Sequence, residues 1–203
     1  EVLRGYTYVP NNPSTFKRLM QEILLLIFSC INFIKAGKPD CIVVFTTPVT
    51  FGLLGYLFKI FYRSKLLINV QDFQVDAASS LNMVKGSFLI NLLSKIEKIS
   101  YRGADIVTSI SSSMVQILDE KEKNINKKLL WPNWIDYKKA SLSPTLNLFR
   151  EKYSIGKEKK IIAYAGNIGL KQGLNIIIDL ARKCEKKEDY LFLIIGDGAG
   201  LKQ

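Results

Sequence analysis

The chain has 203 residues, of which 48% are apolar and 23% charged, and its 29 Lys and Arg against 18 Asp and Glu give a formal charge of +11. This composition excludes a disordered chain, a collagen-like repeat and a disulfide scaffold, and it suits one large domain or one and a half ordinary ones. The chain contains no histidine, so no residue of this chain can supply imidazole as base, nucleophile or metal ligand.

The first part of the chain alternates between predicted helices and short apolar strands. In chain order the sequence predicts a helix over residues 14–35, a strand over 41–45, a helix over 51–62, a strand over 66–70, a polar turn over 71–76, a helix over 87–101, a strand over 105–110, a helix ending near Leu118 and a weaker strand over 128–131. Strands that are continuous apolar runs, alternating with helices, predict an α/β fold with a parallel sheet covered on both faces.

The alternation breaks at Trp131-Pro132-Asn133-Trp134-Ile135-Asp136, and the polar residues 137–144 predict a linker. Beyond it the sequence predicts a short helix near 146–153, a strand over 160–165, a glycine-bearing loop over 166–173, a helix over 174–184 and a strand over 190–195. We therefore expect an N-terminal domain at residues 1–136 that lacks its first βα unit, and the start of a C-terminal domain at 137–203. The glycine-rich turn at 196–200 has no element after it, which indicates a piece of a longer protein.

Two apolar stretches are candidate membrane spans. The uncharged residues 23–34 reach only about 18 Å as a helix, less than the roughly 30 Å of a bilayer core. Residues 41–58 are long enough, but their threonines and Pro48 predict a strand end, a turn and a helix start. The three cysteines (Cys30, Cys41 and Cys184) form no CxxC pair, which favours reduced thiols over a zinc or redox site.

The loop that begins at Gly166 is the strongest candidate for chemistry. Gly166 and Gly169 let backbone amides approach a ligand, the following helix N-terminus favours negative charge, and Lys171 adds a cation, so the loop suits a diphosphate. The alternative is a plain tight turn with a solvated lysine. The turn from Gly196 to Gly200 could line the same ligand at the carboxyl edge of the sheet. The spacing in the loop at Gly166 matches neither a dinucleotide fingerprint nor a Walker loop, and the turn at 196–200 is weak evidence by itself.

Carboxylates follow the strand at 66–70. Asp72 and Asp76 occupy a position from which side chains can reach an adjoining cleft, although solvated turn acids are the more common case. The positive charge has three candidate causes: nucleic acid, an anionic membrane and an anionic small substrate. The sequence shows neither aromatic-basic interleaving nor a DNA-reading helix, so we expect no nucleic-acid partner.

Five segments carry a resemblance to a known family when they are taken in order. They are Asp72 after a buried strand, Arg102-Gly-Ala-Asp105-Ile-Val-Thr-Ser109, Pro132-Asn133-Trp134-Ile135-Asp136, Gly166-Asn167 with Lys171-Gln172-Gly173, and Gly196-Asp197-Gly198. In this order they resemble retaining GT-B glycosyltransferases of family 4, particularly bacterial enzymes that build capsule, O-antigen or exopolysaccharide repeats. The resemblance covers essentially the whole chain, but the family's usual start and last stretch are absent.

The resemblance implies GT-B architecture, with two Rossmann-like domains. It implies transfer, with retention, of a sugar from a UDP- or GDP-sugar to a polyprenyl-diphosphate-linked glycan acceptor. No metal or other cofactor would be needed, and the enzyme would be cytoplasmic and peripheral on the inner face of a bacterial membrane. The donor diphosphate and nucleotide would be bound by Gly166, Asn167, Lys171, Gly196 and Gly198. Asp72 would be the catalytic candidate on the acceptor side, and Asn133 and Asp136 would mark the crossing between domains.

Three positions depart from the family's pattern. Asn167 stands where a basic residue is common, Lys171 lies one position before the usual lysine slot, which holds Gln172, and Gln71 stands where histidine is frequent. The family's paired-glutamate segment would fall beyond Gln203. Two alternatives to the glycosyltransferase activity stay open. The protein could be a sugar-nucleotide epimerase of the same fold, or the chain could be a fragment that is catalytically inactive alone.

Contact with a membrane is a hypothesis that depends on the glycosyltransferase function. Residues 16–34 and 55–65 combine apolar faces with cations, which suits attachment to an anionic lipid surface. The cations are Lys17, Arg18, Lys59, Arg63 and Lys65. The alternative is that both apolar faces pack on the sheet.

Overall fold

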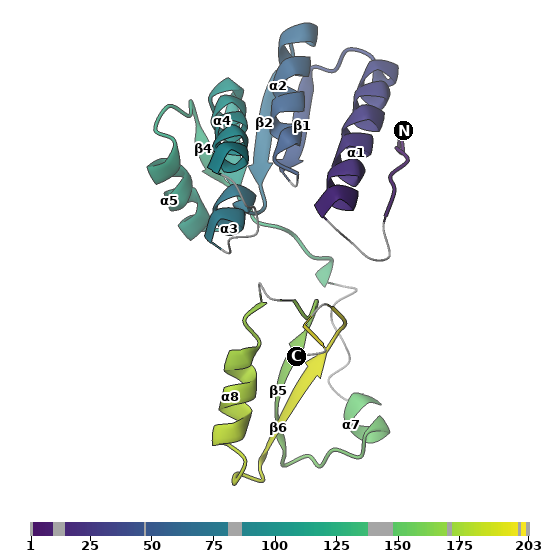
Figure 1. Ribbon diagram of the computed structural model, residues 1–203, viewed down its shortest axis with the longest axis vertical. Helices are drawn as coiled ribbons and strands as arrows, with labels where there is room; N and C mark the ends of the chain where they lie inside the picture. The colour runs from purple at the N-terminus through teal and green to yellow at the C-terminus, as the bar shows by residue number, and fades with distance from the viewer. Residues whose placement is uncertain are drawn as a thin grey trace. The chain divides into compact units, whose positions relative to one another are not determined.

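The computed structural model describes residues 2–9, 15–46, 48–80, 87–137, 148–169, 172–198 and 200–201 (Figure 1). The chain divides into two compact units, Glu1–Trp134 and Ile135–Gln203. The sequence places the domain boundary after residue 136. Both units are built from parallel strands joined through helices.

The first unit contains a four-stranded sheet and its connecting helices. Its elements are α1 (Thr15–Ala36), β1 (Cys41–Thr46), α2 (Thr50–Tyr62), β2 (Lys65–Val70), α3 (Gln74–Ser80), α4 (Ser87–Gly103), β3 (Ile106–Ser109), α5 (Ser112–Lys121) and β4 (Lys128–Leu130). The strands lie in the order β1-β2-β3-β4 and every pair is parallel. The predicted parallel sheet is therefore confirmed, and the apolar residues 41–58 form a strand and a helix rather than one span.

Helix α3 is absent from the sequence prediction, which assigns residues 71–76 to a turn. In the structure the turn is shorter and the helix begins at Gln74. The Gln74 side chain accepts a hydrogen bond from the Val49 backbone N–H at 3.1 Å, and Val75 is buried. These two contacts with the rest of the unit hold a short polar helix that has little periodicity to reveal it.

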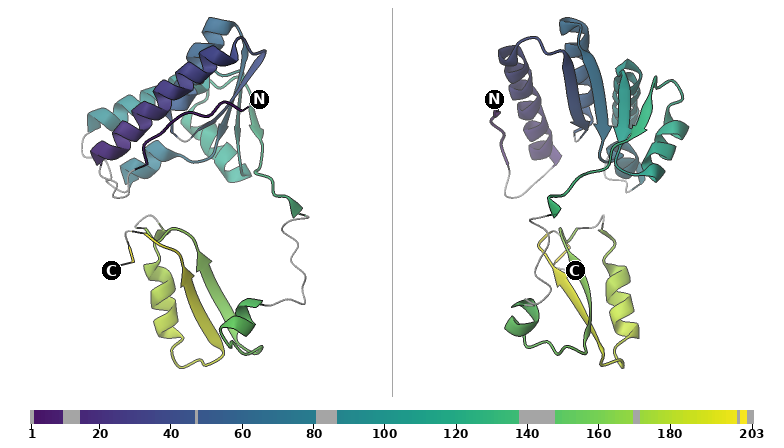
Figure 2. Two further views of the ribbon diagram at one scale, coloured as in Figure 1. Left: turned by 90° about the vertical axis from the view of Figure 1, so that its right-hand side faces the viewer. Right: turned by 180° about the vertical axis from the view of Figure 1, so that it is seen from behind.

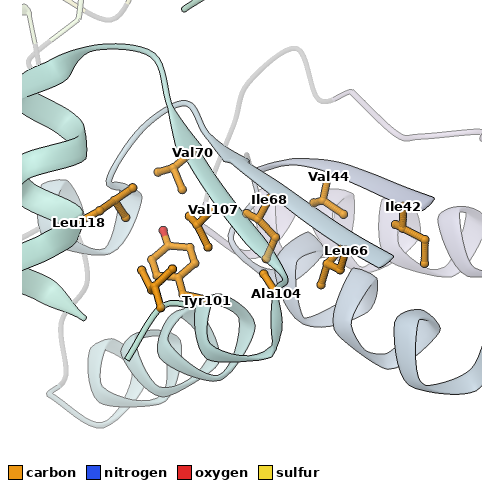
Figure 3. Packing of buried hydrophobic residues seen from close by; sticks show 10 residues of the cluster. Ile42, Val44, Leu66, Ile68, Val70, Tyr101, Ala104, Val107 and Leu118 are labelled. Atoms are coloured by element: carbon orange, nitrogen blue, oxygen red, sulfur yellow. The ribbon is translucent and has the colours of Figure 1, made fainter. Parts of the chain in front are cut away.

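The core of the first unit lies on one face of the sheet. Its residues come from the strands, from α4 and α5, and from the connections that follow these two helices: Ile42, Val44, Leu66, Ile68, Val70, Tyr101, Ala104, Val107, Leu118 and Ile125 (Figure 3). Side chains from α1 and α2, including Phe33 and Phe58, pack against the same cluster. The described helices therefore share one face.

The opposite face of this sheet corrects a sequence expectation. Val43 and Phe45, which alternate with the buried residues of β1, are 46% and 44% exposed. Seen from behind, the strands lie in front of the helices (Figure 2, right). The sequence predicts cover on both faces because β1 is apolar at every position but one, whereas the described residues cover only one face.

The segment Arg102-Gly-Ala-Asp105 is explained by packing. A Cβ on Gly103 would lie 2.2 Å from the Tyr56 ring, so glycine allows α4 to approach α2. Ala104 is fully buried. Asp105 accepts a hydrogen bond from the Leu66 backbone N–H at 2.8 Å and pairs with Lys59 at 2.9 Å. Burial acts to raise the pKa of Asp105, but these two partners outweigh it and hold the pKa below its ordinary value.

A polar network joins α3, α4 and α5. The Lys121 ammonium lies 2.6 Å from Asp76 and 2.8 Å from Glu97, whose side chain is only 3% exposed. The Tyr101 hydroxyl donates to Glu97 at 3.2 Å, and burial with the nearby Glu97 charge raises the pKa of Tyr101. The Lys121 ammonium also lies 5.0 Å from the centre of the Phe73 ring. Three helices are thereby tied to one cation.

The second unit is smaller. It contains α7 (Leu148–Lys152), β5 (Lys160–Ala165), α8 (Asn175–Lys183) and β6 (Tyr190–Ile195). Strands β5 and β6 pair in parallel, with Ile161 opposite Leu191, which confirms the predicted βαβ unit. Among the described residues of this unit, only Ile168 is buried. Its sheet and helix therefore leave much of their apolar surface exposed.

Candidate functional site

Two glycine-bearing loops leave the carboxyl ends of β5 and β6 and bind each other through their backbones. The Gly166 N–H donates to the Ile195 carbonyl at 2.9 Å, and the Ile168 N–H donates to the Asp197 carbonyl at 2.8 Å. The Gly200 N–H returns to the Ile168 carbonyl at 2.9 Å. The sequence-predicted residues Gly166, Gly196 and Gly198 are therefore brought together at one edge of the sheet, as parallel strands require.

The glycines are needed for this contact between loops. A Cβ on Gly196 would lie 1.8 Å from the Gly166 carbonyl oxygen, and a Cβ on Gly198 would lie 2.2 Å from the Ile168 carbonyl oxygen. Sequence reasoning assigns these glycines to close approach of a ligand. In the structure, the close approach that requires them is that of the neighbouring loop.

A cavity of about 570 Å³ lies beside these loops. It is lined by Ile168, Gly169, Gly173, Leu174, Asn175, Ile178, Asp179, Arg182, Ile194, Gly200 and Leu201. The Arg182 guanidinium lies 3.3 Å from the Asp179 carboxylate, so its charge is partly compensated. A cavity with an amide, a guanidinium and apolar walls can bind a ligand that joins an anionic group to an apolar or ring-shaped one.

The site residues predicted from the sequence do not include Asn175, Asp179 and Arg182, all on α8. The signal was available, because these positions are three or four residues apart and therefore share one face of the helix. Helix α8 begins without a side-chain cap, and its first residues follow Gly173, whose φ of 59° lies in the left-handed region. Gly173 thus turns the chain from the loop into the helix.

The remaining donor-site candidates have different positions. Asn167 is exposed in the first loop, where its carbonyl accepts a hydrogen bond from the Tyr164 hydroxyl at 2.9 Å. Gly198 donates its N–H to the Asp197 carboxylate at 2.7 Å. Lys171, the predicted phosphate contact, lies outside the described residues. Asp136 belongs to the second unit and is exposed.

Asp72 lies in the short turn between β2 and α3 of the first unit. Its side chain is exposed, and within the described part of the chain it makes no hydrogen bond or ion pair. Asp76, the second carboxylate of this region, is instead paired with Lys121. The neighbouring Gln71 is bound to Asn133, so the residue at the position where histidine is frequent in the family contacts the predicted crossing residue.

Within the described residues, no group of three or more histidine, cysteine, aspartate and glutamate side chains is arranged to hold a metal ion. The three cysteines are free thiols. The polar groups described at the two sheet edges are backbone amides, side-chain amides, carboxylates and the Arg182 guanidinium. Such groups orient hydroxyls and anionic oxygens.

Comparison with curated proteins finds two bacterial relatives. A protein of Escherichia coli K12 named putative colanic acid biosynthesis glycosyl transferase WcaI is 30% identical over 207 residues, covering 98% of this chain and 50% of that protein. The probable glycosyltransferase WbjE of Pseudomonas aeruginosa is 26% identical over 196 residues, covering 92% and 48%. The chain is related to bacterial glycosyltransferases. It spans about half the length of the curated relatives it matches.

Solved structures show the same fold. HepE of Anabaena in complex with UDP matches with a TM-score of 0.63 at 14% identity, covering 92% of this chain and 46% of that one. The HepE complex with UDP-glucose matches with a TM-score of 0.62 at 13% identity, covering 91% and 45%. The expected α/β fold with parallel, Rossmann-like sheets of the GT-B type is thereby confirmed. No protein-family model matches the sequence.

Proposed function

We propose that the protein belongs to the retaining GT-B glycosyltransferases of family 4 and forms part of a longer enzyme. In this proposal it transfers a sugar from a UDP- or GDP-sugar to a polyprenyl-diphosphate-linked glycan during surface polysaccharide synthesis. The similarity to WcaI over 98% of the chain is the observation that carries the proposal. The shared fold with HepE, which was solved with UDP and UDP-glucose, supports a nucleotide-sugar donor.

The proposed chemistry follows from the groups of the second unit. Departure of the nucleoside diphosphate leaves positive charge on the sugar and negative charge on the phosphates. Backbone N–H groups of the loop after Gly166 that are not bound to the neighbouring loop, together with Lys171, would stabilise that negative charge without a metal ion. In the first unit, Asp72 is exposed and would contact the acceptor.

Product analysis on the protein with its complete coding sequence tests the activity. Membranes that contain the lipid-linked acceptor are incubated with UDP- and GDP-sugars labelled at the anomeric carbon. We expect label to move into lipid-linked glycan from one donor class, with retained configuration and in the presence of EDTA. Label that remains in an epimerised sugar nucleotide would show an epimerase instead, and loss of turnover with EDTA would overturn the metal-free mechanism.

A substitution tests the role of Lys171. Lys171→Ala should lower turnover by about 10²–10³, the usual cost of removing one charge-stabilising donor. Lys186→Ala, at an exposed lysine after α8, is the matched control and should leave turnover unchanged. Near-normal turnover of Lys171→Ala would contradict the proposed phosphate contact.

We also propose that the protein is cytoplasmic and binds the inner membrane face through α1. Seven apolar side chains on this helix are 39–70% exposed: Phe16, Leu19, Met20, Ile23, Ile27, Ile31 and Ile34. They recur every three or four residues and so form one stripe. The alternative holds for the other side of α1, where Phe33 packs against the core cluster of the first unit.

The apolar part of α1 extends beyond the uncharged residues 23–34, which by themselves are too short for a span. Its residues Leu19–Ala36 are long and apolar enough to cross a membrane by length and composition, although one such helix is weak support for a span. The cations predicted to contact lipid are not all available for it. Lys59 is not available to lipid, because it pairs with Asp105 and donates to the Gly103 carbonyl at 2.8 Å. Lys65, with 79% of its side chain exposed, keeps most of its surface in solvent.

Liposome flotation tests the membrane proposal. We expect the chain to float with vesicles that contain anionic lipid, and Ile27→Glu with Ile31→Glu to abolish flotation, since both charges enter the apolar stripe. Ile176→Glu, at a 76% exposed isoleucine of α8, controls for the added charge. Indifference of the unmodified chain to both neutral and anionic vesicles would contradict the proposal.

A further inference from the structure

A buried amide marks the carboxyl end of the first sheet. Asn69 is 1% exposed and lies beside Thr108 on the neighbouring strand. Its Nδ2 donates to the Thr108 hydroxyl oxygen at 2.8 Å and approaches the Trp131 carbonyl oxygen at 3.5 Å. Asn69 therefore links β2 to β3 and to the first residue after β4.

A second amide layer lies above Asn69. The Gln71 Nε2 donates to Asn133 Oδ1 at 3.1 Å, and Asn133 Nδ2 donates to Gln71 Oε1 at 2.9 Å, so the two side chains form a reciprocal pair. The Gln71 Nε2 also donates to Asn69 Oδ1. Gln71 and Asn133 are 62 positions apart in the chain.

The hydrogen-bonding capacity of Gln71 is used inside the protein. Its Nε2 has two hydrogens, and both have acceptors, while its Oε1 accepts from Asn133. A side chain in this state has little left to offer a substrate hydroxyl. Its contacts point to holding another part of the chain in place.

The part held in place is the exit from the first unit. The Trp131 N–H donates to the Ser109 carbonyl at 2.8 Å, and the Trp131 ring lies 6.2 Å from the ring of Phe45. Asn133 follows two residues later. The boundary between the units comes directly after Trp134, which is 79% exposed, as is Ile135 at 74%.

We propose that the Gln71–Asn133 pair is a clamp that fixes the last segment of the first unit to the end of β2. Movement of the connection then begins only beyond Asn133, and the turn that carries Asp72 stays in register with the exit segment. Gln71 is accordingly a positioning residue rather than a substrate contact. The proposal goes beyond the proposed function and is tested without it.

Trp131 fluorescence in the 203-residue chain reports the clamp. In a Trp134→Phe background the emission comes from Trp131 alone, since the sequence has two tryptophans. We expect Gln71→Met and Asn133→Leu each to raise acrylamide quenching of Trp131 several-fold, because either change breaks the reciprocal pair. The exchanged variant Gln71→Asn with Asn133→Gln keeps both amides and should restore most of the protection. Gln116→Met, at an exposed glutamine of α5, is the matched control.

The double variant Gln71→Met with Asn133→Leu decides whether the residues act as a pair. A clamp predicts that its quenching equals that of the stronger single variant, since the pair is already broken. Strictly additive effects, or unchanged quenching in Asn133→Leu, would overturn the proposal. Asn133 is exposed, so its variant keeps the core intact and remains informative even where Gln71→Met unfolds the chain, which urea midpoints would reveal.

Discussion

Gly196 and Gly198 each pack against a carbonyl oxygen of the other loop, so they determine whether the two loops can meet. A methyl group at Gly196 would enter the space of the Gly166 carbonyl. The added Cβ is held rigidly by its own backbone, and the Gly166 carbonyl is itself backbone, so neither group can rotate out of the contact. At Gly169 the situation differs, since an added Cβ would meet only the side-chain ends of Asn167 and Gln172.

Gly196→Ala should therefore separate the loops, while Gly169→Ala should not. We expect a destabilisation of about 1–3 kcal/mol for Gly196→Ala, the usual cost of an overpacked contact. Amide hydrogen exchange at Gly166 and Ile168 measures it, because both N–H groups donate across the loop contact. Equal exchange in the two variants would show that the loops tolerate the added methyl.

Glu122 makes the stability of the first unit depend on pH in the acidic range. Burial by itself raises the pKa of this side chain, but the Asn124 backbone N–H and the Arg102 guanidinium, 3.0 Å away, outweigh burial and lower the pKa below 4.5. A carboxyl whose pKa is lower in the folded state stabilises the fold above its unfolded pKa, and this contribution is lost as pH falls through the folded pKa.

The free energy of unfolding should accordingly fall as the pH is lowered below about 4.5, the ordinary value for Glu122. Urea titrations at several pH values measure this slope. Glu122→Gln should lower stability at pH 7 by on the order of 1 kcal/mol, because a charged hydrogen bond is weakened, and should flatten the acid slope. An unchanged slope in this variant would assign the acid sensitivity to other carboxyls, such as Asp105.

At the scale of elements, Lys121 holds α3, α4 and α5 together. Its removal would leave Glu97 buried without a counter-charge, which is more costly than losing an exposed pair. Lys128 offers a contrast on the same unit, because its partner Asp119 is 58% exposed and can be solvated instead.

Lys121→Met should destabilise the first unit by about 3–5 kcal/mol, whereas Lys128→Met should cost about 1 kcal/mol or less. Adding Glu97→Gln to Lys121→Met should recover part of the loss, since the uncompensated charge disappears. Urea unfolding followed by tryptophan fluorescence measures all three variants. Equal losses for the two lysines would show that Glu97 does not depend on Lys121.

At the scale of the whole molecule, the two units differ in how much they bury. The first unit has a continuous apolar core, while Ile168 is the only buried residue among those described in the second. Few buried contacts and accessible backbone hydrogen bonds permit local opening.

Amides of β5 and β6 should therefore exchange at least about 100-fold faster than those of β2 and β3. Hydrogen–deuterium exchange with peptide resolution measures both units in one sample of the 203-residue chain. A second sample contains UDP at saturating concentration. If the chain binds UDP through these loops, as proposed, exchange should slow in the second unit alone. Equal protection of the two units without ligand would contradict the difference in burial.

Local signals were sufficient for the regular elements. The strands β5 and β6 lie where their apolar runs predict them, and the helices of the first unit agree within a few residues. Helix α3 was missed because it has only seven residues and its stability comes from the contacts of Gln74 and Val75. Cover of the sheet was also misjudged, since an apolar residue such as Val43 does not reveal what lies over it.

The candidate site, too, was predictable from the sequence only in part. Sequence alone placed Gly166, Gly196 and Gly198 at strand ends, and parallel pairing then brings strand ends to one edge. It could not show that these glycines accommodate a neighbouring loop, nor that Asn175 and Arg182 line the adjoining cavity.

The amino-acid sequence by itself determined the α/β class, the parallel pairing and the positions of the glycine turns, because these depend on periodicity and on backbone freedom within short segments. The tertiary structure decided which side chains far apart in the chain are partners. Gln71 and Asn133 show the difference most clearly, since each is an ordinary polar residue until the fold places their amides face to face. Hydrogen bonds between distant residues depend on three-dimensional distance, which no local pattern encodes.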